Sequence, residues 1–188
     1  MVFADTCYQL SDGTFDITSG VLRKVWNFDC SDNIPSQEAI AKELKNIGWD
    51  KVKYDNTHII LPANMEIDFG GIGKEYAVDR AILLIKTLTK QAVLVNLGGD
   101  LATNSARKNG SPWQVGVEHP GFVNEKTMVV SLFKGALATS GDAKRFLHKD
   151  GQRYSHILNA KTGWPIDNAP RSITVSAPQC LQAGYDLL

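Results

Sequence analysis

Cysteine is scarce in this chain, and histidine is scattered. The cysteines Cys7, Cys30 and Cys180 are odd in number, far apart and in no Cys-x-x-Cys pair, which argues against a disulfide framework and against a zinc site. The four histidines share no metal-ligand spacing, so a histidine-built metal centre is not expected either. We therefore expect isolated thiols and no metal site made from these two residue types.

Long apolar runs and an excess of one charge are also missing. No apolar run approaches the roughly 20 residues that span a bilayer. The N-terminal residues lack the basic and apolar regions of an export signal, and Cys7 does not follow an apolar segment as a lipoprotein cysteine would. We expect no membrane anchor in the chain, which as written would stay cytoplasmic, although its compartment remains open. Lys and Arg total 20, as do Asp and Glu, so nucleic acid is not an expected partner.

The length and apolar content are those of one globular domain. With 188 residues, 43% of them hydrophobic, the chain can form one core over residues 1–188. Apolar spacing predicts a helix over residues 35–47 and a hairpin with a polar turn over residues 51–61. Strand patterns follow at residues 92–97, 113–117, 127–133, 135–139, 153–157 and 172–176. A few helices among antiparallel strands indicate an α+β fold.

Residues 65–79 carry the strongest local signal. Residues 65–69 alternate apolar and polar side chains, which predicts a strand that delivers Asp68 beside a glycine turn. Apolar residues at helical spacing follow, so the amides of residues 71–74 should open a helix. Free amides there, the helix dipole and Lys74 favour binding of a polyphosphate.

The common nucleotide motifs do not fit this turn. A P-loop would need glycine at Asp68 and Ser or Thr at Glu75, and the dinucleotide fingerprint fails at Tyr76. A tight connection without any ligand is the alternative, because glycine is common wherever backbone approaches backbone.

Five segments in a fixed order carry a resemblance to one family. Residues 68–79, Asp-Phe-Gly-Gly-Ile-Gly-Lys-Glu-Tyr-Ala-Val-Asp, are similar to Asp-Leu-Gly-Gly-Ile-Ala-Lys-Gly-Tyr-Ala-Val-Asp of the ApbE family, the FAD:protein FMN transferases. Residues 13–18, 95–100, 138–142 and 154–165 resemble its Gly-x-Phe-Asp-x-Thr, Val-Asn-Leu-Gly-Gly-Glu/Asp, Ala-Thr-Ser-Gly-Asp and Ser-His-Ile-Ile-Asp-Pro-x-Thr-Gly-x-Pro. The resemblance implies a sheet-rich, T-fold-like α+β domain, shortened at both ends relative to the family.

The resemblance also implies a reaction. FMN would pass from FAD to a Thr or Ser hydroxyl of an acceptor flavoprotein of a membrane redox complex, with AMP leaving and magnesium assisting. Asp68 would lie in the flavin site with a catalytic role, the Gly71 backbone beside the metal, and Lys74 on the FAD. His156 would act on the acceptor, since imidazole suits proton transfer near neutral pH; a hydrogen-bonded structural histidine is the alternative. The other implied flavin-binding residues are Gly70, Gly73, Asn96, Gly98, Gly99, Thr139, Ser140, Gly141, Asp142 and Ile157.

Residues 139–142 allow a second interpretation. We expect them to form a polar turn after an apolar strand, where they could contact nucleotide. They could equally cap a helix that begins at Ala143.

Several positions depart from the family pattern. Gly184 and Leu188 stand where the family has the Asp and Thr whose oxygens bind magnesium, and Asn159 replaces another Asp. Asp186, two residues beyond the first of these positions, is the remaining candidate ligand. Two alternatives therefore stay open: a pyrophosphatase that splits FAD into FMN and AMP, and a flavin-binding or assembly protein that has lost its metal chemistry.

Overall fold

The computed structural model describes residues 1–118, 126–141, 145–167 and 170–187, and its paired strands run antiparallel. The α+β fold expected from the sequence is therefore confirmed. The chain divides into two compact units, Met1–Phe69 with Lys144–Ala169 and Gly70–Ala143 with Pro170–Leu188. The single domain expected over the whole chain stays a prediction. Among the described helices, none combines the length and hydrophobicity needed to cross a bilayer.

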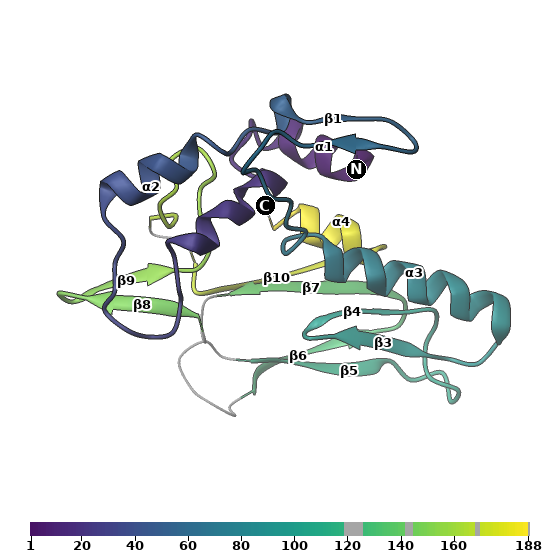
Figure 1. The fold of residues 1–188 in the computed structure, drawn as a ribbon. Helices are drawn as coiled ribbons and strands as arrows, with labels where there is room; N and C mark the ends of the chain where they lie inside the picture. The colour runs from purple at the N-terminus through teal and green to yellow at the C-terminus, as the bar shows by residue number, and fades with distance from the viewer. Residues whose placement is uncertain (119–125, 142–144, 168–169, 188) are drawn as a thin grey trace. The chain divides into compact units, whose positions relative to one another are not determined.

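The first unit is built from short helices and two hairpins (Figure 1). Its elements are α1 (Val2–Leu10), the 3-10 helices η1 (Ile17–Lys24) and η2 (Trp49–Lys51), α2 (Gln37–Leu44), the pair β1 (Lys53–Tyr54) and β2 (Ile59–Ile60), and the pair β8 (Phe146–Lys149) and β9 (Gln152–Ser155). The predicted helix over residues 35–47 is α2, which Ser36 caps by accepting the amide of Ala39 at 3.2 Å. The predicted hairpin over residues 51–61 is the β1–β2 pair.

Trp26 lies at the centre of the first unit's core. Its ring stacks on Phe28 with centroids 5.4 Å apart and meets the edge of Trp164 at 5.5 Å. Its indole N–H donates to the carbonyl of Gly163 at 2.8 Å. Gly163 has a φ of +70°, and a Cβ there would come within 2.6 Å of Ile40. Packing and backbone conformation together therefore require glycine in the Thr-Gly pair of residues 154–165.

The second unit is a four-stranded sheet covered on both faces (Figure 1). The strand order is β10 (Ser172–Ala177), β7 (Gly135–Gly141), β4 (Asp100–Thr103) and β3 (Leu94–Leu97). On one face α3 (Gly73–Leu88) and α4 (Cys180–Tyr185) pack on a mostly alanine surface. On the other face Leu101 and Leu137 meet the hairpin of β5 (Trp113–Glu118) and β6 (Lys126–Leu132). Alternating side chains along β4 and β7 serve the two faces.

Two local predictions are wrong. Residues 65–69 form no strand, and Phe69 is 43% exposed, because this segment meets the rest of its unit through the start of η1 and not through a strand partner. The predicted strand over residues 92–97 exists as β3, but it is an edge strand and its last residue, Leu97, is 40% exposed instead of buried.

Candidate functional site

The Gly-x-Phe-Asp-x-Thr segment has a structural role in the first unit. Asp16 is buried and caps η1 by accepting the amide of Thr18 at 2.8 Å and its hydroxyl at 2.7 Å. The second carboxylate oxygen of Asp16 accepts the amide of Trp49 at 2.9 Å. The Thr18 hydroxyl accepts the amide of Gly48 at 2.9 Å. The motif thereby fastens the loop after α2 to the start of η1.

Asp68 is exposed and lies beside η1. Its amide donates to the carbonyl of Ile17 at 2.8 Å. A Cβ on Gly20 would come within 2.8 Å of the Asp68 Cβ, so the close approach needs glycine at position 20. The structure therefore delivers Asp68 next to the buried Asp16 motif, although by a loop and not by the predicted strand.

His156 and Ile157 follow β9, which ends at Ser155, one or two residues earlier than predicted. The imidazole is half-buried, and its ring meets the edge of Phe28 with centroids 6.3 Å apart. Ile157 donates its amide to the Ser155 hydroxyl at 3.2 Å and accepts the amide of Ile166 at 3.0 Å. His156 thus sits between two anchored neighbours, which limits its movement.

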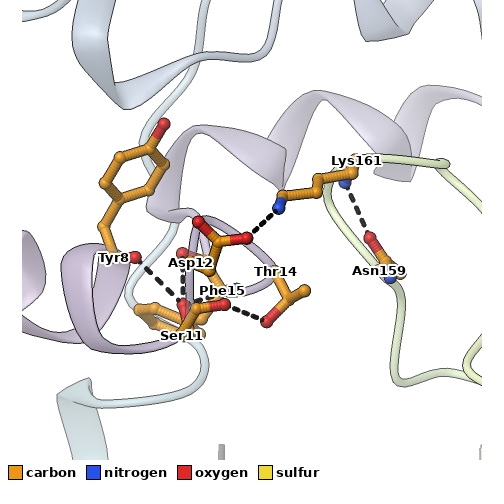
Figure 2. Close-up of polar contacts among 7 residues, drawn as sticks. All are labelled: Tyr8, Ser11, Asp12, Thr14, Phe15, Asn159 and Lys161. Carbon is orange, nitrogen blue, oxygen red and sulfur yellow. Dashed lines mark hydrogen bonds and ion pairs between the residues drawn. The ribbon is translucent and has the colours of Figure 1, made fainter.

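Asn159 is tied to the N-terminal segment through Lys161, as Figure 2 shows. The side-chain oxygen of Asn159 accepts the amide of Lys161 at 2.8 Å, and the ammonium of Lys161 pairs with Asp12 at 2.8 Å. The hydrogen bond from Lys161 lowers the pKa of Asp12. An aspartate at position 159 could accept the same amide, so the asparagine changes the local charge and leaves the turn intact.

In the second unit, residues 70–72 form the turn that leads into α3. Gly70 and Gly71 are exposed, and the helix begins at Gly73 as predicted. In the described part of the chain no side chain caps this helix N-terminus, and the first helical hydrogen bond runs from the amide of Tyr76 to the carbonyl of Ile72 at 3.1 Å. The dipole and the first amides of α3 therefore favour an anion at this end.

Lys74 is held by a residue to which sequence reasoning gave no role. Its ammonium is hydrogen-bonded to one carboxylate oxygen of Asp100, the first residue of β4. The other oxygen of Asp100 accepts the amide of Thr139 at 3.1 Å. Asp100 is 1% exposed whereas Lys74 is half-exposed. One buried carboxylate thus brings together two of the predicted site residues, with the lysine reaching solvent.

Asn96, Gly98 and Gly99 lie at the exposed turn between β3 and β4. Both glycines have positive φ, +68° and +105°, as a two-residue hairpin turn requires. The side-chain oxygen of Asn96 accepts the amide of Gly99 at 2.9 Å. The turn leaves open space around both glycines and returns the chain at Asp100.

Residues 139–141 are not the polar turn expected from the sequence. Thr139, Ser140 and Gly141 continue β7, because β10 pairs with the full length of that strand. The Thr139 hydroxyl shares a hydrogen bond of 2.9 Å with that of Thr174, and a Cβ on Gly141 would come within 2.9 Å of the Arg171 carbonyl. Asp142 and Ala143 lie outside the described residues, and the alternative helix is not continued beyond them, since Phe146 begins strand β8.

Glu75 is the second residue that sequence reasoning missed. It is 6% exposed and begins the buried stripe of α3 that continues with Val78 and Ile82. Its Oε2 is buried and has no hydrogen-bond partner among the described residues. A Cβ on Gly184 would lie 2.8 Å from Cγ of Glu75 and 3.3 Å from its carboxyl carbon. The signal was present in the sequence, since glutamate stands at the family's glycine position.

Asp79 holds α4 against α3. Its two carboxylate oxygens accept the amides of Cys180 and Leu181, each at 2.9 Å. The aspartate that ends the motif of residues 68–79 is thus the cap of α4. This contact sets Gly184 beside Glu75.

Burial dominates the titration of these groups. It raises the pKa of Glu75, opposed by the residue's own backbone amide; Asp100 raises this pKa further and Lys74 lowers it. Burial, with the charges of Asp100, Asp79 and Glu75, raises the pKa of the Cys180 thiol to about 12.

Within the described ranges, no group of three or more His, Cys, Asp or Glu side chains is arranged to hold a metal ion. Asp186, the candidate ligand from the sequence, is exposed at the end of α4, where its amide donates to the carbonyl of Gln182 at 3.0 Å. Leu188 lies outside the described residues. The metal role of Asp186 and of the Gly71 backbone stays a prediction.

Comparison with known proteins assigns the chain to a family. The profile of the ApbE family matches residues 1–185, so the chain belongs to the ApbE family. It is 31% identical over 183 residues to the FAD:protein FMN transferase of Escherichia coli K12 and 28% identical over 186 residues to that of Haemophilus influenzae. These matches take in 92% and 93% of the chain but 52% and 54% of the two relatives, so the chain spans about half their length.

Solved structures give the same assignment. The ApbE protein of Thermotoga maritima superimposes with a TM-score of 0.83 at 34% identity, over 97% of this chain and 60% of that one. The flavinyl transferase ApbE of Pseudomonas stutzeri gives a TM-score of 0.80 at 30% identity, over 96% and 57%. The fold predicted from the family resemblance is confirmed by these matches.

Proposed function

We propose that the chain takes part in FAD:protein FMN transfer, moving FMN from FAD to a Thr or Ser hydroxyl of an acceptor flavoprotein of a membrane redox complex. The observation that carries this proposal is the start of α3, where no described side chain caps the helix and Lys74 stands beside its first amides. It lies within the segment most similar to the family's glycine motif. Such an end of a helix suits the diphosphate of FAD.

The second unit supplies the groups for the phosphates. The amides at the start of α3 and the ammonium of Lys74 would bind the diphosphate and offset the charge that develops on it. Asp100 holds Lys74 in position before substrate arrives, because its buried carboxylate is itself fixed by the amide of Thr139. This pre-positioning is the contribution of the protein to such a reaction, since phosphoryl transfer depends on orientation and electrostatics.

The chemical step balances without a covalent enzyme intermediate. The acceptor hydroxyl oxygen forms a bond to the phosphorus of the FMN moiety, and the bond from that phosphorus to the bridging oxygen breaks. AMP leaves with the bridging oxygen. His156, in the first unit, is the proposed acceptor of the hydroxyl proton. A divalent cation, when bound, would neutralise phosphate charge.

Mass spectrometry of an acceptor protein tests the proposal. The chain is incubated with FAD, magnesium and an acceptor flavoprotein, and AMP is quantified in parallel. We expect the acceptor to gain one FMN for each AMP released. AMP and free FMN without labelled acceptor would instead identify a pyrophosphatase. FAD bound but intact under all metal conditions would identify a flavin-binding protein and overturn the transferase.

A further inference from the structure

Two positions of this chain have exchanged residue types relative to the family pattern. The family segment has glycine where this chain has Glu75, and the family's last motif has aspartate where this chain has Gly184. The two residues are in contact: a Cβ at position 184 would lie 2.8 Å from Cγ, 3.3 Å from Cδ and 3.5 Å from Oε1 of Glu75. The carboxylate of Glu75 therefore fills the space that a side chain at position 184 would enter.

The exchange is sterically coupled. A side chain at position 184 cannot coexist with Glu75 in this position, because its Cβ alone would approach closer than real Cβ atoms do. Removing Glu75 without adding a group at position 184 would leave a hole and remove a carboxylate. Only the paired states, glycine with aspartate or glutamate with glycine, keep both the packing and one carboxylate.

The surroundings of Glu75 call for a positive partner. Its Oε2 is buried and unpaired within the described part of the chain. Asp100 and Asp79 contribute two further carboxylates, and of the charged groups that act on these residues only Lys74 is cationic, its ammonium already paired with Asp100. A buried carboxylate oxygen needs a hydrogen-bond donor, a proton or a cation.

We propose that Glu75 supplies the carboxylate ligand for a divalent cation, a role that the family pattern gives to position 184. The ligand has moved from α4 to α3 while its carboxylate has stayed in the same place. The absence of a three-carboxylate cluster among the described residues agrees with magnesium, which keeps several waters and takes one or two carboxylates together with substrate phosphates. The inference rests on the proposed function for its phosphate partner, but the binding of the cation can be measured alone.

Manganese binding, followed by electron paramagnetic resonance with and without FAD, tests this assignment. We expect the wild-type chain to bind Mn²⁺ and Glu75→Gln, which keeps the shape, to weaken it by at least about tenfold, since even outer-shell partners of a metal change affinity that much. The double variant Glu75→Gly with Gly184→Asp should restore binding, while Glu75→Gly alone should not. Asp186→Asn, which removes an exposed carboxylate from the end of α4, is the matched control and should bind as wild type.

Three results would overturn the assignment: no Mn²⁺ binding by the wild-type chain in the presence of FAD, unchanged binding by Glu75→Gln, or loss of binding in Asp186→Asn instead. Circular dichroism establishes that each variant is folded. Should the double variant not fold, Glu75→Gln still decides the question. Mn²⁺ binding that follows Glu75 without any FMN transfer would overturn only the transferase proposal, whereas FMN transfer with binding indifferent to Glu75 would overturn only the ligand assignment.

Discussion

The ammonium of Lys74 on α3 is paired with the buried carboxylate of Asp100 on β4. Since the same carboxylate also accepts the amide of Thr139, Asp100→Asn should leave one hydrogen bond weakened and the lysine without its counter-ion. We expect the free energy of unfolding to fall by about 1–3 kcal/mol, the range for a buried polar group left poorly paired. Urea denaturation measures it. Asp186→Asn, at an exposed position, should change stability by less than about 0.5 kcal/mol; equal losses in both variants would contradict the role of Asp100.

Lys74→Ala should weaken FAD more than riboflavin. Riboflavin has no phosphate, so only FAD loses an ionic contact, and we expect its dissociation constant to rise by about tenfold, which corresponds to about 1.4 kcal/mol. Isothermal titration calorimetry measures both ligands. Lys86→Ala, at the opposite end of the same helix, is the control and should leave both affinities unchanged. If riboflavin lost as much affinity as FAD, Lys74 would not be a phosphate contact.

Gly184→Ala should destabilise the chain, because the new methyl group would overlap Cγ of Glu75 at 2.8 Å. Overpacking of this kind costs about 1–3 kcal/mol. The same substitution in a Glu75→Gly background should cost much less, because the overlap is gone. A double-mutant cycle from thermal or urea unfolding gives the coupling energy between the two positions. Additive effects would show that residues 75 and 184 do not share this space.

Asp16→Ala should act on stability and not on flavin chemistry. The substitution removes the cap of η1 and leaves the amide of Trp49 without its acceptor, for a combined loss of about 2–4 kcal/mol. Urea denaturation measures the loss, and Asp32→Ala, at an exposed position, is the control. A variant of wild-type stability that fails to bind FAD would move Asp16 from the scaffold into the site.

The three thiols should differ in reactivity with pH. Burial raises the pKa of Cys7 to about 11 and that of Cys180 to about 12, from an ordinary value of 9.0, so both stay protonated and unreactive at pH 8. Cys30 is exposed. Titration with DTNB at pH 8 should therefore label one thiol in the folded chain and all three in denaturant. Rapid labelling of a second thiol in the folded chain would contradict the burial of Cys7 or Cys180.

Much of the framework could be predicted from residue patterns. The apolar spacing after Gly73 gave α3 and its starting point, and alternation with β-branched residues gave strands β5, β6, β7 and β10. These are elements whose local pattern agrees with their burial. Residues 65–69 show the opposite case: they alternate like a strand, but a strand also needs a partner, and the segment is instead placed by the single bond from Asp68 to Ile17.

The candidate site was predictable as far as the family motifs reach. Those motifs mix scaffold with site: Asp16 and Asp79 cap helices, and Gly163 is required by packing against Ile40. Spacing along the chain cannot separate these roles. Nor could it reveal that Glu75 and Gly184 touch, because they are over a hundred residues apart and meet only through the packing of α4 on α3.

A crystal structure with FAD and Mn²⁺ soaked in tests the central claim most directly. We predict density for the diphosphate at the amides that open α3, within hydrogen-bond reach of Lys74, and an anomalous manganese peak next to the carboxylate of Glu75. Diphosphate bound away from the start of α3, or those amides occupied by neighbouring protein groups, would contradict the claim.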